Sequence, residues 1–267
     1  MPQTSFTIQK DLTYDEHPSC KVDLYLPDRE DFDVLVYFHG GGFESGNKAD
    51  MVEACSDMAK NGVAAISAEY RMYPDAKFPD FVVDGAKAVR WALTLFPSTE
   101  KKPRRFYIGG SSAGAYLAML LCFDERYRLA QGWTHEEIDG YFFNAGQPTT
   151  HFNVLRERGI DIRKVVVDDA APLYHVGAEP VPRLAFLLAE HDIPCRLEQT
   201  RLLWKTMEHF GHSSDTIHFE ILEGFGHNQY DFLADESGWN ILAGRILRFM
   251  ESTGQASPET DTTHKEI

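Results

Sequence analysis

The sequence predicts an α/β protein in which helices cover both faces of a mostly parallel sheet. Short apolar segments with strand-like patterns alternate along the chain with longer segments whose apolar residues have helical spacing. Some of the short segments, such as VAAISAEY at 63–70, are almost uninterrupted, which is typical of strands buried on both faces. No repeat or linker divides the chain, so we expect residues 1–250 to form one domain.

The predicted elements begin with strands at 22–27 and 34–40. A helix at 50–62 ends at a glycine suited to a C-terminal cap, and a strand at 63–70 follows it. The next helix, 78–96, has Pro79 near its start, where proline is tolerated. The remaining elements, in chain order, are strand 104–112, helix 113–123, strands 138–146 and 182–192, helix 196–210, strand 216–224 and helix 239–250.

Two segments lie outside this alternation. Residues 147–182 carry one short helical pattern, FNVLRERG, between two predicted strands. An insertion of this length usually lies over one end of the sheet, so we expect a small cap there. The polar residues 251–267 predict a disordered tail.

The overall charge excludes some classes of partner. The formal net charge is −15, which disfavours binding to nucleic acids and anionic membranes. No apolar run is long enough to span a bilayer, and residues 1–17 lack the apolar core of a secretory signal. We therefore expect a cytoplasmic protein, or a chain already processed, with neither nucleic acid nor membrane as a partner.

The cysteines and histidines do not predict a metal site. Cys20, Cys55, Cys122 and Cys195 have no paired C-x-x-C spacing, so we expect free or structural thiols. The histidines 209, 212 and 218 fall on different predicted elements, which argues against a shared ion.

A glycine cluster follows the strand at 34–40, in the sequence HGGGF. Glycine there indicates that something approaches the backbone closely, either nucleotide phosphates or a reacting carbonyl. Gly40, Gly42 and Gly46 form a near variant of the dinucleotide fingerprint, and Glu69 lies where a ribose would be bound. The third glycine, however, is one position late, and no helix follows directly.

A second glycine cluster favours the reacting carbonyl. Gly110, Ser112 and Gly114 form G-x-S-x-G where a strand meets a helix. A nucleophile on such a sharp turn adopts a strained backbone, and small neighbours let the chain turn without collision. We therefore predict that Ser112 is a nucleophile and that Ser111 is structural.

The serine needs a base, because its hydroxyl is a weak nucleophile at its own pKa. In α/β sheets the partners follow later strands, the acid before the histidine. Asp192 comes just past the strand at 182–192 and His227 just past the strand at 216–224. We expect both at the same sheet edge as Ser112, while Asp215 is predicted to be a turn residue and His191 lies too close to the acid to reach Ser112.

These motifs resemble those of the α/β-hydrolase fold esterases, over roughly residues 20–250. HGGGF, YRMYPDAKFPDFVVDGAKAVRW, GSSAG, the Asp192 loop and GFGH are similar to the hormone-sensitive-lipase-like and acetyl- or feruloyl-esterase branch. The resemblance implies a Ser112–Asp192–His227 triad. It also implies an oxyanion hole made by the backbone N–H groups of Gly41, Gly42 and Ala113, and a reaction without cofactor or metal.

The resulting hypothesis is a serine carboxylesterase that hydrolyses short-chain acyl esters of small molecules, such as acetylated or feruloylated carbohydrates. An amidase or arylformamidase with the same triad is the nearest alternative, and a non-catalytic ligand receptor is a more distant one. His39 is predicted to brace the glycine loop, and Arg71 and Asp84 to form a structural ion pair. The sequence does not indicate an oligomeric state.

Overall fold

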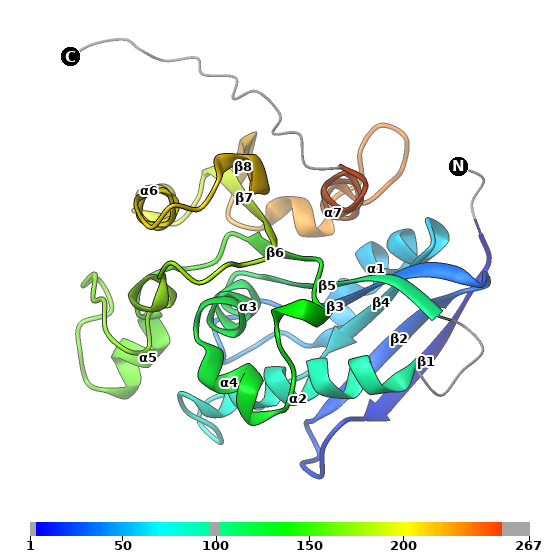
Figure 1. Ribbon diagram of the computed structural model, residues 1–267, viewed down its shortest axis with the longest axis horizontal. Helices are drawn as coiled ribbons and strands as arrows, with labels where there is room; N and C mark the ends of the chain where they lie inside the picture. The colour runs from blue at the N-terminus through cyan, green and yellow to red at the C-terminus, as the bar shows by residue number, and fades with distance from the viewer. Residues whose placement is uncertain (1–3, 97–101, 253–267) are drawn as a thin grey trace.

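The computed structural model describes residues 4–96 and 102–252 of the 267-residue chain. In this part of the chain, eight strands form one sheet in the spatial order β1-β2-β4-β3-β5-β6-β7-β8 (Figure 1). Neighbours from β4 to β8 are parallel, whereas β1 and β2 are joined antiparallel at one edge. The strands are β1 Phe6–Thr13, β2 Lys21–Pro27, β3 Asp31–Phe38, β4 Val63–Ala68, β5 Lys102–Ser111, β6 Gly140–Asn144, β7 Arg183–His191 and β8 Ile217–Gly226.

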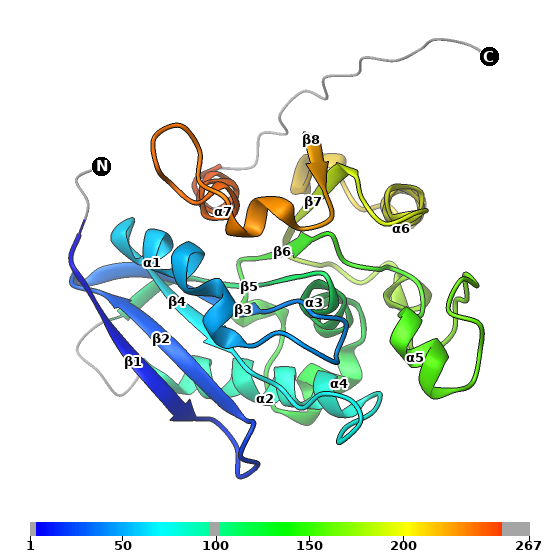
Figure 2. The ribbon, with the colours of Figure 1, turned by 180° about the vertical axis from the view of Figure 1, so that it is seen from behind.

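Helices cover both faces of the sheet, as the alternation of elements predicts. The α-helices are α1 Val52–Lys60, α2 Asp80–Leu95, α3 Ala113–Phe123, α4 Glu125–Ala130, α5 Phe152–Glu157, α6 Arg196–His209 and α7 Ile241–Glu251. Helices α1 and α7 pack on one face, while α2, α3 and α6 pack on the other (Figures 1 and 2). The mostly parallel α/β architecture is thus confirmed.

The two faces are built by alternation along each strand. On β3, Val36 and Phe38 point into the core under α2 and α3. Leu35 and Tyr37, between them, point into the core under α1 and α7. Burial on both faces removes the polar–apolar alternation, and for this reason the central strands appear in the sequence as continuous apolar runs.

Two elements were not predicted from the sequence. Strand β1 is an edge strand whose side chains are mostly exposed, so it lacks an apolar pattern. Helix α4 has only six residues, too few for helical periodicity to stand out. The segment 147–182 contains α5 and a 3-10 turn at Pro172–His175. The tail predicted for 251–267 lies, from residue 253 onward, outside the described residues.

Helix α3 approaches the end of β3 closely because Gly114 has no side chain. A Cβ added at this glycine would lie 2.1 Å from the carbonyl oxygen of Phe38 and 2.5 Å from that of His39. A Cβ on Gly110 would lie 2.4 Å from the backbone of Gly114. The flanking glycines of G-x-S-x-G therefore allow three backbone segments to meet beneath Ser112.

We expect Gly114→Ala to lower the free energy of unfolding by about 2 kcal/mol or more, because backbone carbonyls must move to admit the methyl group. Gly244→Ala, inside α7, is the matched control, since nothing lies within 4 Å of its Cβ position. There alanine should stabilise the protein by up to about 1 kcal/mol through helix propensity. Urea unfolding of both variants measures this, and equal effects would contradict the packing argument.

Candidate active site

The predicted Ser, Asp and His meet at the carboxyl edge of the sheet. Ser112 follows β5, Asp192 follows β7 and His227 follows β8. Since these strands are parallel, their ends share one edge. Nε2 of His227 lies 2.9 Å from Oγ of Ser112, and its Nδ1 lies 2.6 Å from Oδ1 of Asp192. The three side chains form one hydrogen-bonded chain.

Ser112 occupies a backbone conformation that side chains rarely adopt, with φ 52° and ψ −110°. Such a conformation costs about 1–3 kcal/mol and persists only where the surroundings impose it. The N–H of Ser112 donates to the carbonyl of Asn144 on the neighbouring strand at 2.7 Å. A Cβ on Gly40 would lie 3.4 Å from Cβ of Ser112, so the glycine loop lies directly beside the serine.

Asp192 is held as a carboxylate. Its side chain is almost fully buried, and Oδ1 also accepts a hydrogen bond from the N–H of Ile193 at 2.7 Å. Burial by itself would raise the pKa of Asp192, but the hydrogen bond and charge of His227 outweigh it and hold this pKa below its usual value. A buried carboxylate of this kind fixes the tautomer of the imidazole by accepting its Nδ1 proton.

The glycine loop has a backbone conformation that requires glycine. Gly41 and Gly42 have positive φ, 111° and 64°, and a Cβ on Gly41 would lie 1.8 Å from the carbonyl oxygen of Ser45. Within the described residues, neither N–H group has a hydrogen-bond acceptor. Ala113 is the first residue of α3, a position whose N–H has no partner inside the helix.

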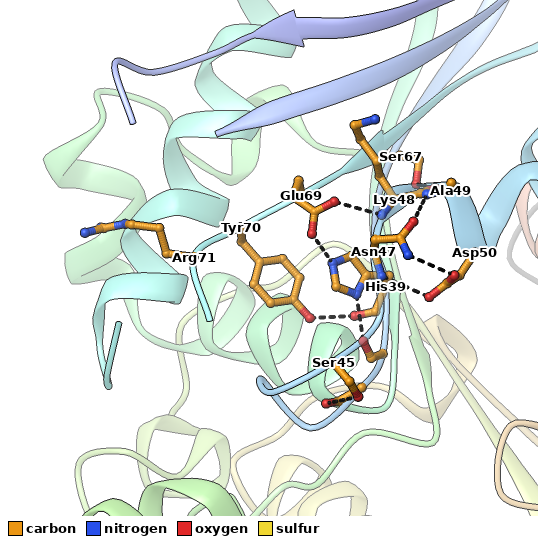
Figure 3. A network of polar contacts seen from close by, with 12 residues as sticks. His39, Ser45, Asn47, Lys48, Ala49, Asp50, Ser67, Glu69, Tyr70 and Arg71 are labelled. Atoms are coloured by element: carbon orange, nitrogen blue, oxygen red, sulfur yellow. Dashed lines mark hydrogen bonds and ion pairs between the residues drawn. The ribbon is translucent and has the colours of Figure 1, made fainter. Parts of the chain in front are cut away.

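His39 braces this loop, as the sequence predicts (Figure 3). Its Nδ1 donates to the carbonyl of Gly40 at 2.7 Å, and its Nε2 lies 3.1 Å from Oε1 of Glu69. Tyr70 stacks on the imidazole and donates its hydroxyl to the His39 carbonyl. Oε2 of Glu69 accepts the N–H of Lys48 at 3.0 Å. The acid that a dinucleotide site would use for ribose is therefore engaged in holding the loop.

A buried carboxylate that the sequence analysis did not identify lies behind the triad. Asp231 is 4% exposed. Its Oδ2 accepts from Oγ of Ser111 at 2.6 Å and from Nδ2 of Asn228 at 2.9 Å, while Oδ1 accepts from Nδ2 of Asn144 at 2.7 Å. Burial raises the pKa of Asp231 to about 6, and these hydrogen bonds limit the rise.

The partners of Asp231 adjoin Ser112 and His227. Ser111 precedes Ser112, Asn228 follows His227, and Asn144 also accepts the Ser112 N–H through its carbonyl. Oγ of Ser111 also contacts the hydroxyl of Tyr37 at 2.8 Å, consistent with the structural role predicted for this serine. Asp231 itself lies in the 3-10 turn Gln229–Phe232, four positions after His227, and this turn is too short to show a periodic pattern.

Other residues singled out in the sequence lie outside this cluster. His191 is exposed, and Asp215 belongs to the 3-10 turn Ser214–Thr216. Arg71 and Asp84 form the predicted ion pair, at 2.8 Å. A cavity of about 450 Å³ lies at the opposite end of α3 from Ser112 and includes His212 among its lining residues, but it contains none of the predicted site residues.

The described residues contain one grouping of His, Cys, Asp or Glu side chains close enough to hold a metal ion, at Asp15, Cys20 and Asp84. Lys87 pairs with Asp15 and Arg71 with Asp84, so protein cations already neutralise both carboxylates. All four cysteines are free thiols. Among residues 4–96 and 102–252, no helix has both the length and the apolar character needed to cross a bilayer.

Comparison with known proteins places these features in context. A family model described as BD-FAE matches residues 22–155. The probable isoprenylcysteine alpha-carbonyl methylesterase ICMEL2 of Arabidopsis thaliana is 26% identical over 148 residues, which cover 53% of this chain and 35% of that protein. The matches to the first curated relatives span 34–45% of those proteins' lengths.

Solved structures share the fold over nearly the whole chain. Esterase B from Lactobacillus rhamnosis HN001 superposes with a TM-score of 0.74 at 15% identity, covering 94% of this chain and 85% of that one. A truncated carbohydrate esterase from gut microbiota gives 0.72 at 18% identity, covering 94% and 98%. The α/β-hydrolase fold expected from the motifs is confirmed, as is the resemblance to esterases of this fold.

We expect Asp231→Asn to change how stability depends on pH. The pKa of Asp231 is about 6 in the folded protein and about 4 when unfolded, so the folded state binds more protons between these values. This carboxyl therefore makes stability fall as pH rises from about 4 to 6. The free energy of unfolding of wild type minus variant, from urea titrations, should decline over this range by up to about 3 kcal/mol.

The control for this prediction is Asp235→Asn, at an exposed carboxyl in the next turn. Hydrogen bonds from Ser237 and the N–H of Trp239 lower the pKa of Asp235, so its contribution to stability has the opposite dependence on pH. A wild-type-minus-variant difference for Asp231 that rises with pH would contradict the assignment of a raised pKa.

Proposed function

The chain belongs to the BD-FAE family, and we propose that it is a serine carboxylesterase that cleaves short-chain acyl esters of small molecules through an acyl-enzyme. The observation that carries this proposal is the hydrogen-bonded chain from Ser112 through His227 to Asp192, beside a glycine loop with free N–H groups. Nucleophile, base, orienting acid and oxyanion donors are the parts that acyl transfer requires.

In the proposed first step, Oγ of Ser112 attacks the ester carbonyl while Nε2 of His227 takes the hydroxyl proton. His227 then gives this proton to the departing alcohol, and Asp192 stabilises the imidazolium that forms in between. Ser112 and His227 are both partly exposed, so a substrate can reach them. The buried carboxylate of Asp192 needs no contact with the substrate.

The backbone N–H groups of Gly41, Gly42 and Ala113 are the proposed donors to the negatively charged oxygen of the tetrahedral intermediate. Donors already aimed at that oxygen are worth about 3–4 kcal/mol each, because the site does not reorganise as charge develops. The brace around His39 supports this role, since it fixes the loop before substrate arrives. Water activated by His227 would then release the acid from Ser112, without a cofactor.

The segment 147–182 is the proposed cap over the acyl pocket. A Cβ on Gly42 would lie 3.3 Å from Cζ of Phe152, so the start of α5 lies directly against the glycine loop. Figure 1 shows α5 beyond α3, on the side of the molecule away from β1 and β2.

A carbohydrate ester is the proposed substrate class, supported by the fold shared with the carbohydrate esterase from gut microbiota.

Replacement of the nucleophile tests the proposal. Ser112→Ala should lower kcat for p-nitrophenyl acetate by at least about 10³-fold without unfolding the protein. Ser111→Ala, the adjacent control, should keep much of the activity but lose about 1–3 kcal/mol of stability, because Asp231 loses a donor. An organophosphate should add its phosphoryl mass to Ser112 in peptide mapping. Full activity of Ser112→Ala would exclude the proposed mechanism.

Chain-length preference tests the cap. Several of its charged side chains are in ion pairs, such as Arg158 with Asp168, and its exposed apolar surface is confined to Ile162, Tyr174 and the short run that includes Val165 and Val167. Such a segment offers no continuous apolar wall for a long acyl chain. We expect kcat/KM to be highest for acetyl to butyryl p-nitrophenyl esters and about tenfold or more lower by C10. A maximum at C8 or longer would mean that the cap encloses an apolar tunnel.

A further inference from the structure

Asn153, the second residue of α5, is a buried side chain without a partner. It is 2% exposed, yet among the described residues neither Nδ2 nor Oδ1 of its carboxamide has a hydrogen-bond partner. Buried polar groups are nearly always paired, because an unpaired one loses its hydration without compensation. An apolar residue of the same size would avoid this cost, so the amide calls for an explanation.

The neighbouring His151 has the same property. It is 1% exposed, and its Nε2 has no partner in the described chain. Its Nδ1 accepts the N–H of Asn153 at 3.2 Å, so in the neutral ring the proton lies on Nε2. Burial, and then the positive charge of Arg196, hold the pKa of His151 well below its usual value, which keeps the ring neutral. His151 thus holds an unused donor two residues before Asn153, whose carboxamide holds an unused donor and acceptor.

These groups lie at the glycine loop. A Cβ on Gly42 would lie 3.4 Å from Nδ2 of Asn153, so the absent side chain of this glycine leaves the amide facing the loop. The ring of His151 packs on Phe43, the next residue of the loop, with centroids 4.9 Å apart. Nδ2 of Asn153 and the ring of His151 therefore lie beside the loop whose N–H groups are the proposed oxyanion donors.

We propose that Asn153, with His151 beside it, recognises a hydroxyl group carried by the substrate close to the scissile ester. A hydroxyl both donates and accepts, so it matches the donor and acceptor of one carboxamide, and it is neutral like both protein groups. This inference rests on the proposed esterase function and assigns the selection of hydroxylated esters, carbohydrate esters among them, to these two residues. The hydroxyl belongs either to the acyl chain or to the alcohol, and the experiment separates the two.

The consequence is discrimination against substrates that lack the hydroxyl. A site built to pair with a hydroxyl leaves its own buried groups unpaired when the analogue binds, so the analogue is rejected more strongly than one lost contact would suggest. We expect the hydroxylated ester to be preferred by about tenfold or more in kcat/KM.

The test compares two matched ester pairs. For the acyl side these are p-nitrophenyl 3-hydroxybutyrate and p-nitrophenyl butyrate, and for the alcohol side glycerol 1-acetate and propyl acetate. Each kcat/KM ratio is divided by the ratio of alkaline hydrolysis rates, which removes the intrinsic reactivity of the esters. Wild type should show a corrected ratio of about 10 or more for one pair, and Asn153→Leu should bring that ratio close to 1.

Thermal unfolding provides a second readout. Asn153→Leu should raise Tm by a few degrees, because it removes an unpaired buried amide. Asn61→Leu, the same change at the end of α1, is the control: it removes the hydrogen bond to the Asp57 carbonyl and should leave the ester ratio as in wild type. A purely structural Asn153 would instead give a lower Tm and an unchanged ratio.

Two outcomes would overturn the inference: corrected ratios near 1 for both pairs in wild type, or a high ratio that survives in Asn153→Leu. Failure of the esterase proposal has a different signature, since no ester of either pair would then be hydrolysed faster by wild type than by Ser112→Ala.

Discussion

The strained backbone of Ser112 is the constraint on which the rest of the site depends. With φ 52° and ψ −110°, the chain reverses between β5 and α3 within one residue, and this turn lifts Oγ toward Nε2 of His227. The turn exists only because Gly110 and Gly114 let three backbone segments meet without side chains between them. A side chain at either glycine would displace the serine or the loop that carries the free N–H groups, so the same close packing positions the proposed nucleophile and the proposed oxyanion donors.

Asp231 secures that turn from behind and ties it to the histidine loop. Its carboxyl group accepts hydrogen bonds from Ser111, Asn144 and Asn228, which belong to β5, β6 and the loop after β8. The charge of His227 also acts on the pKa of Asp231, so the two groups interact electrostatically. An imidazolium formed at His227 would have two carboxylates near it. Asp192 contacts the ring directly, whereas Asp231 is hydrogen-bonded to the next residue, Asn228. The second adds negative charge without competing for Nδ1, because the network occupies its oxygens.

The sequence predicted a structural feature correctly where the physical cause of that feature leaves a local pattern of residues. Burial on both faces leaves uninterrupted apolar runs in the central strands, and the sharp turn between β5 and α3 requires glycines around Ser112. The sheet and the approximate positions of Asp192 and His227 could therefore be predicted. Strand β1 was missed because an exposed edge imposes no apolar alternation. Asp231 and Asn153 were missed for another reason: their significance lies in which distant groups surround them. A carboxyl or a carboxamide in a polar segment gives no indication of whether it will be buried, paired or left without a partner.

The site therefore contains two kinds of buried polar group, each of which loses hydration on folding. They differ in whether hydrogen bonds within the protein compensate for that loss. Asp231 is buried with at least three donors, and such a satisfied group acts by holding its neighbours rigid. Asn153 and His151 are buried just as deeply, but part of their hydrogen-bonding capacity is unused. Rigidity alone cannot account for that, because a leucine or a phenylalanine would fill the same volume without the desolvation cost. Unused capacity at the glycine loop makes sense if a molecule from outside completes it. In that case the hydrogen bonds that Asn153 and His151 do not form in the free protein would form with a bound ester, and they would favour an ester that carries a hydroxyl group over one that does not.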